Sequence, residues 1–194
     1  MKRLIVIPLV HVPFGVWESK RLEYTFGKDP NPVTVKKIID GHKIYWDMVD
    51  CYLKQEHFDK VYQEGSEVEY SVQEFLEGFG RYKGKDRNVD AFFGLINRGV
   101  EFVRTESTYA RNETNRRSIF EEPDELEPCD SFIAKNINNT LRDGQRGVLF
   151  LGVKHGVDII LNEKYQETKA ERFHQDPSYL IDLLNSISVK HRSI

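Results

Sequence analysis

Four side chains that could carry acid–base or metal chemistry stand at or just beyond the ends of apolar runs. They are His11, Glu64, Glu106 and His155. If the runs are parallel strands of one sheet, their carboxyl ends meet at one edge, where α/β proteins bind ligands. Two imidazoles with one or two carboxylates suit a divalent metal that keeps an open position for water. Such a metal lowers the pKa of its bound water to about 7 and so generates a nucleophile.

Roles follow from these residue types. His11, Glu64 and His155 are the expected ligands of a divalent metal ion of unidentified kind. The same three residues and Glu106 form the expected catalytic set. Without a metal, a histidine paired with a glutamate could act as a general base. The sequence therefore predicts a hydrolase site, metal-assisted in its favoured form, at the carboxyl ends of the strands.

Other polar residues could contact a substrate. Arg104 and Asp130 are the expected substrate-binding residues, and Arg116 and Arg117 could also hold an anionic group. A solvated surface position is a plain alternative explanation for each arginine. Polar residues are also common wherever a strand leaves the core, so any one candidate has a structural explanation. The functional prediction depends on several of them meeting in one place.

Familiar catalytic motifs are absent from the sequence. No P-loop follows Gly78 or Gly80, and Gly152 and Gly156 lack the spacing of a dinucleotide-binding loop. Neither an HExxH zinc motif nor a GxSxG nucleophile elbow occurs. The strand ends are therefore the place where chemistry is expected.

The elements that would position these residues alternate between strands and helices. Apolar runs predict strands over residues 4–10, 58–64, 100–106 and 147–151, with an edge strand at 165–170. Amphipathic spacing and caps predict helices over residues 32–56, 71–79, 86–97, 130–142 and 157–161, and a last one from residue 176. This alternation is typical of an α/β domain with a mainly parallel central sheet flanked by helices. We expect residues 1–194 to form one such domain.

The longest predicted helix, over residues 32–56, contains a histidine that needs no functional explanation. Its apolar residues recur at i, i+3, i+4 and i+7, the period of one helix face. His42 lies within this stripe, between Ile39 and Tyr45. We therefore expect His42 to pack in or beside the core.

Composition limits the classes of partner. The chain has 194 residues, a net charge of -3 and 39% hydrophobic residues, which is an ordinary globular balance. It lacks the basic face of a nucleic-acid binder, and no apolar run approaches the roughly 20 residues of a membrane span. Cys51 and Cys129 form no CxxC pair and suit a reducing cytoplasm. We expect a cytoplasmic protein with a small-molecule or peptide substrate, no nucleic-acid or membrane partner, and homo-oligomerisation left open.

Two segments resemble a known family. The Ile133-Ala134 pair precedes the strand that ends in Gly152-Val153-Lys154-His155, and near the N-terminus Pro8-Leu9-Val10-His11 is followed by Tyr62-Gln63-Glu64. This arrangement resembles the core of TraB/Tiki-like proteins, in the wider group of erythromycin-esterase-like and ChaN-like proteins. The resemblance covers about half of the chain and implies a hydrolase-like pocket. Tiki-like members look like metal-dependent proteases, whereas erythromycin-esterase-like members hydrolyse an ester without a metal.

The sequence departs from the family pattern at two positions. Pro8 stands where the group has glycine, and Cys129 stands where it usually has arginine before the acidic residue of a helix start. These departures favour an alternative function from another class. In that alternative the chain keeps the fold but binds a small ligand or a partner without catalysis.

Overall fold

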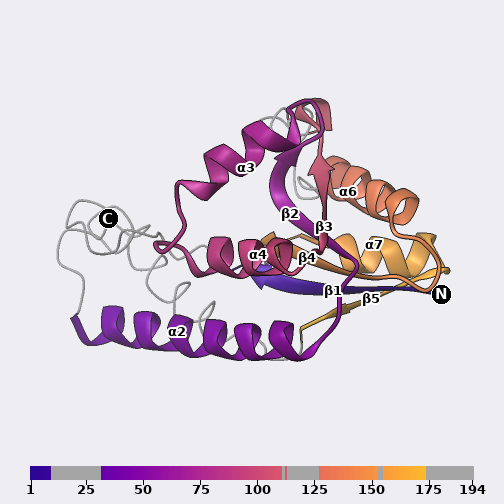
Figure 1. Ribbon diagram of the computed structural model, residues 1–194. Helices are drawn as coiled ribbons and strands as arrows, with labels where there is room; N and C mark the ends of the chain where they lie inside the picture. The colour runs from indigo at the N-terminus through magenta and orange to yellow at the C-terminus, as the bar shows by residue number, and fades with distance from the viewer. Residues whose placement is uncertain (10–31, 111, 113–126, 153–154, 174–194) are drawn as a thin grey trace, which may run out of the picture.

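Five parallel strands form the central sheet (Figure 1). The computed structural model describes residues 1–9, 32–110, 112, 127–152 and 155–173. The strands are β1 (Lys2–Leu9), β2 (Lys60–Glu67), β3 (Glu101–Glu106), β4 (Arg146–Gly152) and β5 (Thr168–Arg172). The flanking helices are α2 (Pro32–Gln55), α3 (Val72–Gly80), α4 (Arg87–Asn97), α6 (Glu127–Thr140) and α7 (Val157–Lys164). Across the sheet the strands follow the order β3-β2-β4-β1-β5, so the predicted α/β class is confirmed.

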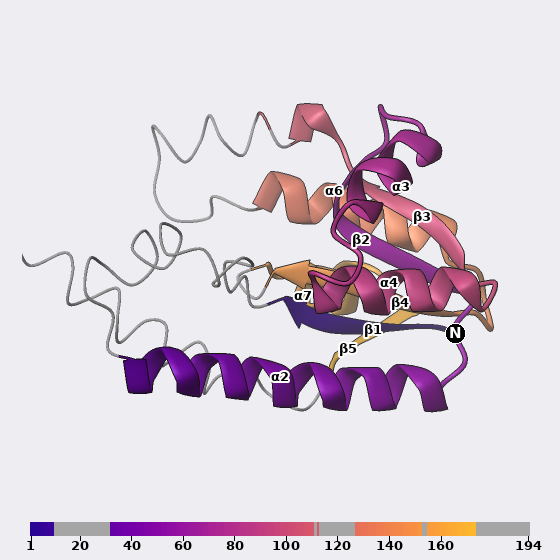
Figure 2. The ribbon, with the colours of Figure 1, turned by 60° about the vertical axis from the view of Figure 1, so that its left-hand side comes forward.

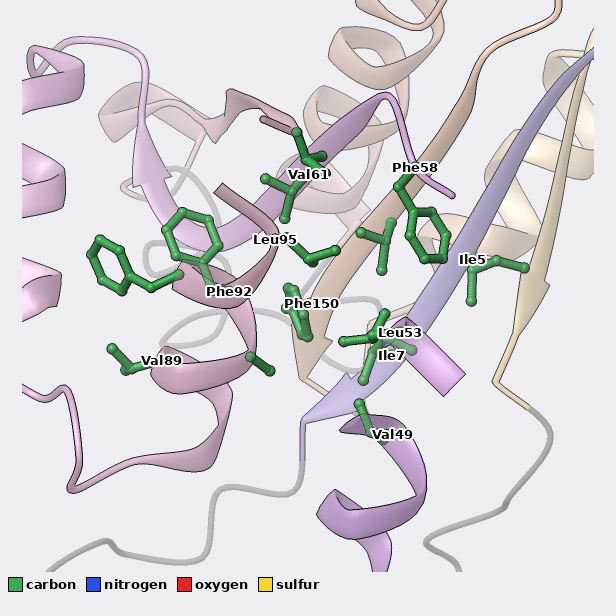
Figure 3. Close-up of a cluster of buried hydrophobic side chains, with 14 of the residues drawn as sticks. Ile5, Ile7, Val49, Leu53, Phe58, Val61, Val89, Phe92, Leu95 and Phe150 are labelled. Carbon is green, nitrogen blue, oxygen red and sulfur yellow. The ribbon is translucent and has the colours of Figure 1, made fainter. Parts of the chain in front are cut away.

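Helices cover both faces of the sheet (Figure 1 and Figure 2). On one face α2 and α4 enclose a core that includes Val49, Phe92 and Phe150 (Figure 3). On the other face α6 and α7 enclose a second core that includes Ile137 and Leu161. The central strands β1 and β4 are therefore buried on both sides, which explains their nearly unbroken apolar sequences.

Local signals in the sequence correctly placed several helices. Ser71 caps α3 in a reciprocal pair with Glu74, and the Asp86 side chain caps α4.

In α2, the indole Nε1 of Trp46 donates to Nε2 of His42 at 3.0 Å. Burial, with a smaller contribution from the charge of Arg87, lowers the pKa of His42 to about 4. His42 is thus a neutral core histidine, as its position in the apolar stripe predicted.

Several predicted boundaries were wrong. The second strand does not end at residue 64 but continues to Glu67 through an irregularity in its pairing with β3. Gly65 permits this because its φ of +80° lies in the left-handed region that favours glycine. Helix α6 begins at Glu127, so Asp130 lies inside the helix and not at its start. The edge strand spans Thr168–Arg172, a little later than predicted, because the turn after α7 extends beyond Tyr165.

The last predicted helix, from residue 176, lies outside the described residues.

Candidate functional site

An imidazole between two carboxylates lies at the carboxyl edge of the sheet. Glu64 belongs to β2 and His155 follows β4, and these strands are neighbours. The Nε2 atom of His155 lies 3.3 Å from Oε1 of Glu64. The Nδ1 atom of the same ring bonds to Oδ1 of Asp130, which α6 supplies. The side chains of His155, Glu64 and Asp130 are 11%, 23% and 5% exposed, so the cluster is largely shielded from water but still accessible.

Each carboxylate also accepts a hydrogen bond from the backbone around His155. The Gly152 N–H donates to Oε2 of Glu64 at 2.6 Å, and the Gly156 N–H donates to Oδ2 of Asp130 at 2.6 Å. The His155 N–H donates to the Gly152 carbonyl at 3.1 Å. Glu64 and Asp130 therefore hold both the ring and the backbone that carries it, which fixes the ring before any substrate arrives.

Gly152 is required by how closely Glu64 and His155 approach the backbone. A Cβ atom at this position would lie 3.1 Å from Oε2 of Glu64 and 3.3 Å from Cδ2 of His155. Both side chains would have to move to admit it. The glycine at the end of β4 is thus part of the site and not only a strand terminator.

The two carboxylates favour the protonated form of His155. Burial by itself lowers the pKa of this imidazole, but the hydrogen bonds and charges of Asp130 and Glu64 outweigh burial and raise the pKa to about 10. The ring is therefore an imidazolium at neutral pH. It presents an N–H donor at Nε2, directly beside the Glu64 carboxylate.

The other predicted residues make contacts outside this cluster or lie outside the described residues. Glu106 is buried at the end of β3, and its Oε1 accepts from the N–H of Gly65 at 2.5 Å, so it supports the backbone that follows Glu64. The guanidinium of Arg104 donates to the Val68 carbonyl at 2.9 Å. His11 lies outside the described residues, as do Arg116 and Arg117.

Sequence reasoning did not predict the contacts around His155. It expected Asp130 to bind substrate, whereas the structure places both of its oxygens on His155 and Gly156. The early start of α6, which brings Asp130 into its first turns, carries no clear signal in the sequence. The contacts of Arg172 and Asp158 beside the same backbone were also not anticipated.

Two of the three residues that the sequence predicts as metal ligands lie close together. Glu64 and His155 lie together, and the carboxylate of Asp130 on the far ring nitrogen is the usual outer partner of a metal-binding histidine. Within the described residues, no group of three or more histidine, cysteine or acidic side chains is arranged to hold a metal ion. The third expected ligand, His11, is outside that part of the chain.

Comparison of the chain with family models, curated proteins and solved structures finds no match. In the described segments, none of the helices has the length and apolar character needed to cross a membrane. An inference of function must therefore start from the geometry around His155.

Proposed function

We propose that the protein is a hydrolase whose acid–base pair is Glu64 and His155. The observation that supports this most strongly is the His155 ring held between Asp130 and Glu64 at the edge of the sheet where parallel α/β proteins bind ligands. The resemblance to TraB/Tiki-like and erythromycin-esterase-like proteins points to the same reaction class. An ester or amide bond in a small molecule or peptide is the proposed substrate.

The charges of the pair suggest a division of labour. The Glu64 carboxylate accepts a proton from a water molecule while the water oxygen attacks the acyl carbon. The leaving oxygen or nitrogen takes a proton from Nε2 of His155 as its bond to carbon breaks. The proton on Glu64 then passes to Nε2, 3.3 Å away, and restores both groups. The products are a carboxylic acid and an alcohol or amine.

Asp130 acts in this proposal without touching substrate. Its hydrogen bond to Nδ1 holds the ring orientation and stabilises the imidazolium. Its second oxygen keeps the backbone at Gly156 in place. It is therefore a positioning residue.

A metal-assisted form of the same hydrolysis is the second candidate, and one distance favours it. Oε1 of Glu64 and Nε2 of His155 are 3.3 Å apart, close enough for both atoms to bind one ion. His11 is the proposed third ligand. A bound divalent metal would supply the activated water by lowering its pKa.

The test uses untagged protein, before and after treatment with a chelator, on a panel of aryl esters and peptides. We expect Glu64→Gln and His155→Gln to reduce turnover by at least about 100-fold. The control is Glu101→Gln at the amino end of β3, whose carboxylate pairs with Lys60. Turnover that survives chelation supports the metal-free form. Near-stoichiometric metal that is lost in both site variants supports the metal-assisted form.

Two results would contradict the proposal. One is wild-type protein, metal-loaded or metal-free, that turns over no member of the panel. The other is turnover that persists in both site variants. The first result would favour the alternative that the fold binds a ligand or partner without catalysis.

A further inference from the structure

Arg172 connects the edge strand of the sheet to the backbone of His155. It is the last residue of β5, which pairs only with β1 among the described strands. Its Nε donates to Oδ2 of Asp158 at 2.8 Å, and its Nη2 donates to Oδ1 of Asp158 at 2.7 Å. Nη2 also donates to the carbonyl oxygen of His155. One guanidinium therefore joins β5, the first turn of α7 and the residue that carries the site's imidazole.

The arrangement uses the planar shape of a guanidinium. Two parallel hydrogen bonds to the Asp158 carboxylate fix the plane of the Arg172 guanidinium. The second N–H of Nη2 then points at the carbonyl oxygen of His155. Asp158 lies in the first turn of α7, where its negative charge is favoured by the helix dipole. Its side chain is 14% exposed and that of Arg172 is 35% exposed, so water competes only in part for these bonds.

The ring and the carbonyl oxygen of His155 are consequently held at three points. Asp130 and Glu64 hold its two ring nitrogens, and Arg172 holds its carbonyl oxygen. A shift of the carbonyl would rotate the peptide unit between His155 and Gly156. The Gly156 N–H of that same peptide unit is bonded to Asp130. Backbone and ring positions are therefore mechanically linked.

We propose that Arg172 is a positioning residue, which fixes the His155–Gly156 peptide and thereby keeps the His155 ring between Asp130 and Glu64. Asp158 orients the guanidinium for this purpose. The inference concerns the resting protein, and only its kinetic consequence rests on the proposed hydrolase function. The competing explanation is that the Arg172–Asp158 ion pair only connects α7 to β5. In that case it would stabilise the fold without affecting the His155 ring.

The decisive readout is the proton on Nδ1 of His155, observed by NMR far downfield of the amide signals and assigned by its loss in His155→Gln. The variants are Arg172→Met, Arg172→Lys and Asp158→Asn. The matched control is Arg87→Met, because Arg87 also pairs with two carboxylate oxygens, those of Asp47 and Asp50, both at 2.7 Å. Spectra are recorded below the melting temperature of each variant.

We expect the downfield signal to shift or vanish in Arg172→Met, and to change less in Arg172→Lys and Asp158→Asn. It should stay unchanged in Arg87→Met. In the hydrolase assay, kcat should fall by about 10- to 100-fold in Arg172→Met, since small displacements of catalytic groups have large kinetic effects. If Arg172→Met does not fold, the other two variants decide the question.

An unchanged signal in folded Arg172 and Asp158 variants would overturn the inference, whatever their melting temperatures. A signal that shifts in a protein that hydrolyses no substrate would leave the inference standing and count against the proposed function instead. The two ideas therefore fail separately.

Discussion

At the scale of single residues, His155 takes its proposed chemistry from its two acidic neighbours. Asp130 is the stronger of the two influences on the ring, ahead of Glu64, and both act against the effect of burial. A histidine at the same place without them would be neutral at pH 7. The acid–base character of the site thus resides in the trio of side chains and not in the histidine alone.

Replacing the carboxylate of Asp130 tests this dependence. In Asp130→Asn the pKa of His155 should fall from about 10 toward its ordinary value of 6.5, because an amide cannot stabilise the imidazolium by charge. Glu64→Gln should lower the pKa by less. NMR titration of the His155 ring measures both shifts. A pKa that stays near 10 in Asp130→Asn would show that another group holds the proton.

Part of this trio was predictable. Glu64 and His155 stand at the ends of apolar runs, and their meeting required only that β2 and β4 be neighbours. That adjacency is a long-range property, which no local pattern encodes. Asp130 was predicted to begin a helix and to bind substrate, but its contact with His155 depends on α6 beginning at Glu127 and on how that helix crosses the sheet. The spacing of residues in the sequence therefore could not show which carboxylates contact the ring nitrogens of His155.

At the scale of elements, glycines shape both strands that carry the site. Gly65 allows β2 to continue past Glu64 through an irregularity in its pairing with β3, and the N–H of Gly65 is bonded to Glu106. The sequence suggested a strand end at this point because Gly-Ser usually signals a turn. The sequence did not indicate that the buried Glu106 side chain would accept a hydrogen bond from the N–H of Gly65.

A second glycine in β4 tests the packing of the sheet. A Cβ atom at Gly147 would lie 3.0 Å from Cε2 of Tyr62 and 3.1 Å from Cδ1 of Leu4, both in the core. Gly147→Ala should therefore lower the free energy of unfolding by about 1–3 kcal/mol through overpacking. Urea denaturation measures the change.

The matched control is a glycine with open space around it. Gly94 lies exposed within α4, and a Cβ atom there would meet nothing within 4 Å. Gly94→Ala should raise the free energy of unfolding by about 0.5–1 kcal/mol, because alanine is the better helix former. Equal effects at Gly147 and Gly94 would contradict the close packing around β4.

At the scale of the whole molecule, the strand order assembles the site from distant parts of the sequence. The order β3-β2-β4-β1-β5 places β4 at the centre, between β2 and β1. Alternating patterns predicted the α/β class and the parallel sheet, since each apolar run was followed by a helix. They could not predict the order, because several orders bury the same apolar faces. The sequence therefore predicted that Glu64 and His155 lie at the same edge of the sheet, but not the contacts that they make there.

The raised pKa of His155 makes the stability of the whole fold depend on pH. The folded protein retains the imidazole proton up to a pH of about 10, whereas the unfolded chain releases it near 6.5. This contribution to stability is fully present below about pH 6.5 and is lost as the pH rises toward 10. It is on the order of a few kcal/mol, since one pKa unit corresponds to about 1.4 kcal/mol.

Urea denaturation of wild type and His155→Gln between pH 6 and pH 10.5 isolates this contribution, because the other titrating groups are common to both proteins. The stability advantage of the wild type should shrink steadily as the pH rises through this range. His57→Gln is the control, because that side chain is 87% exposed and is not part of the cluster around His155. An advantage that is constant with pH would mean that the folded protein does not hold the His155 proton more tightly than the unfolded chain. The ion pair with Glu64, on which the proposed acid–base chemistry depends, would then be absent at neutral pH.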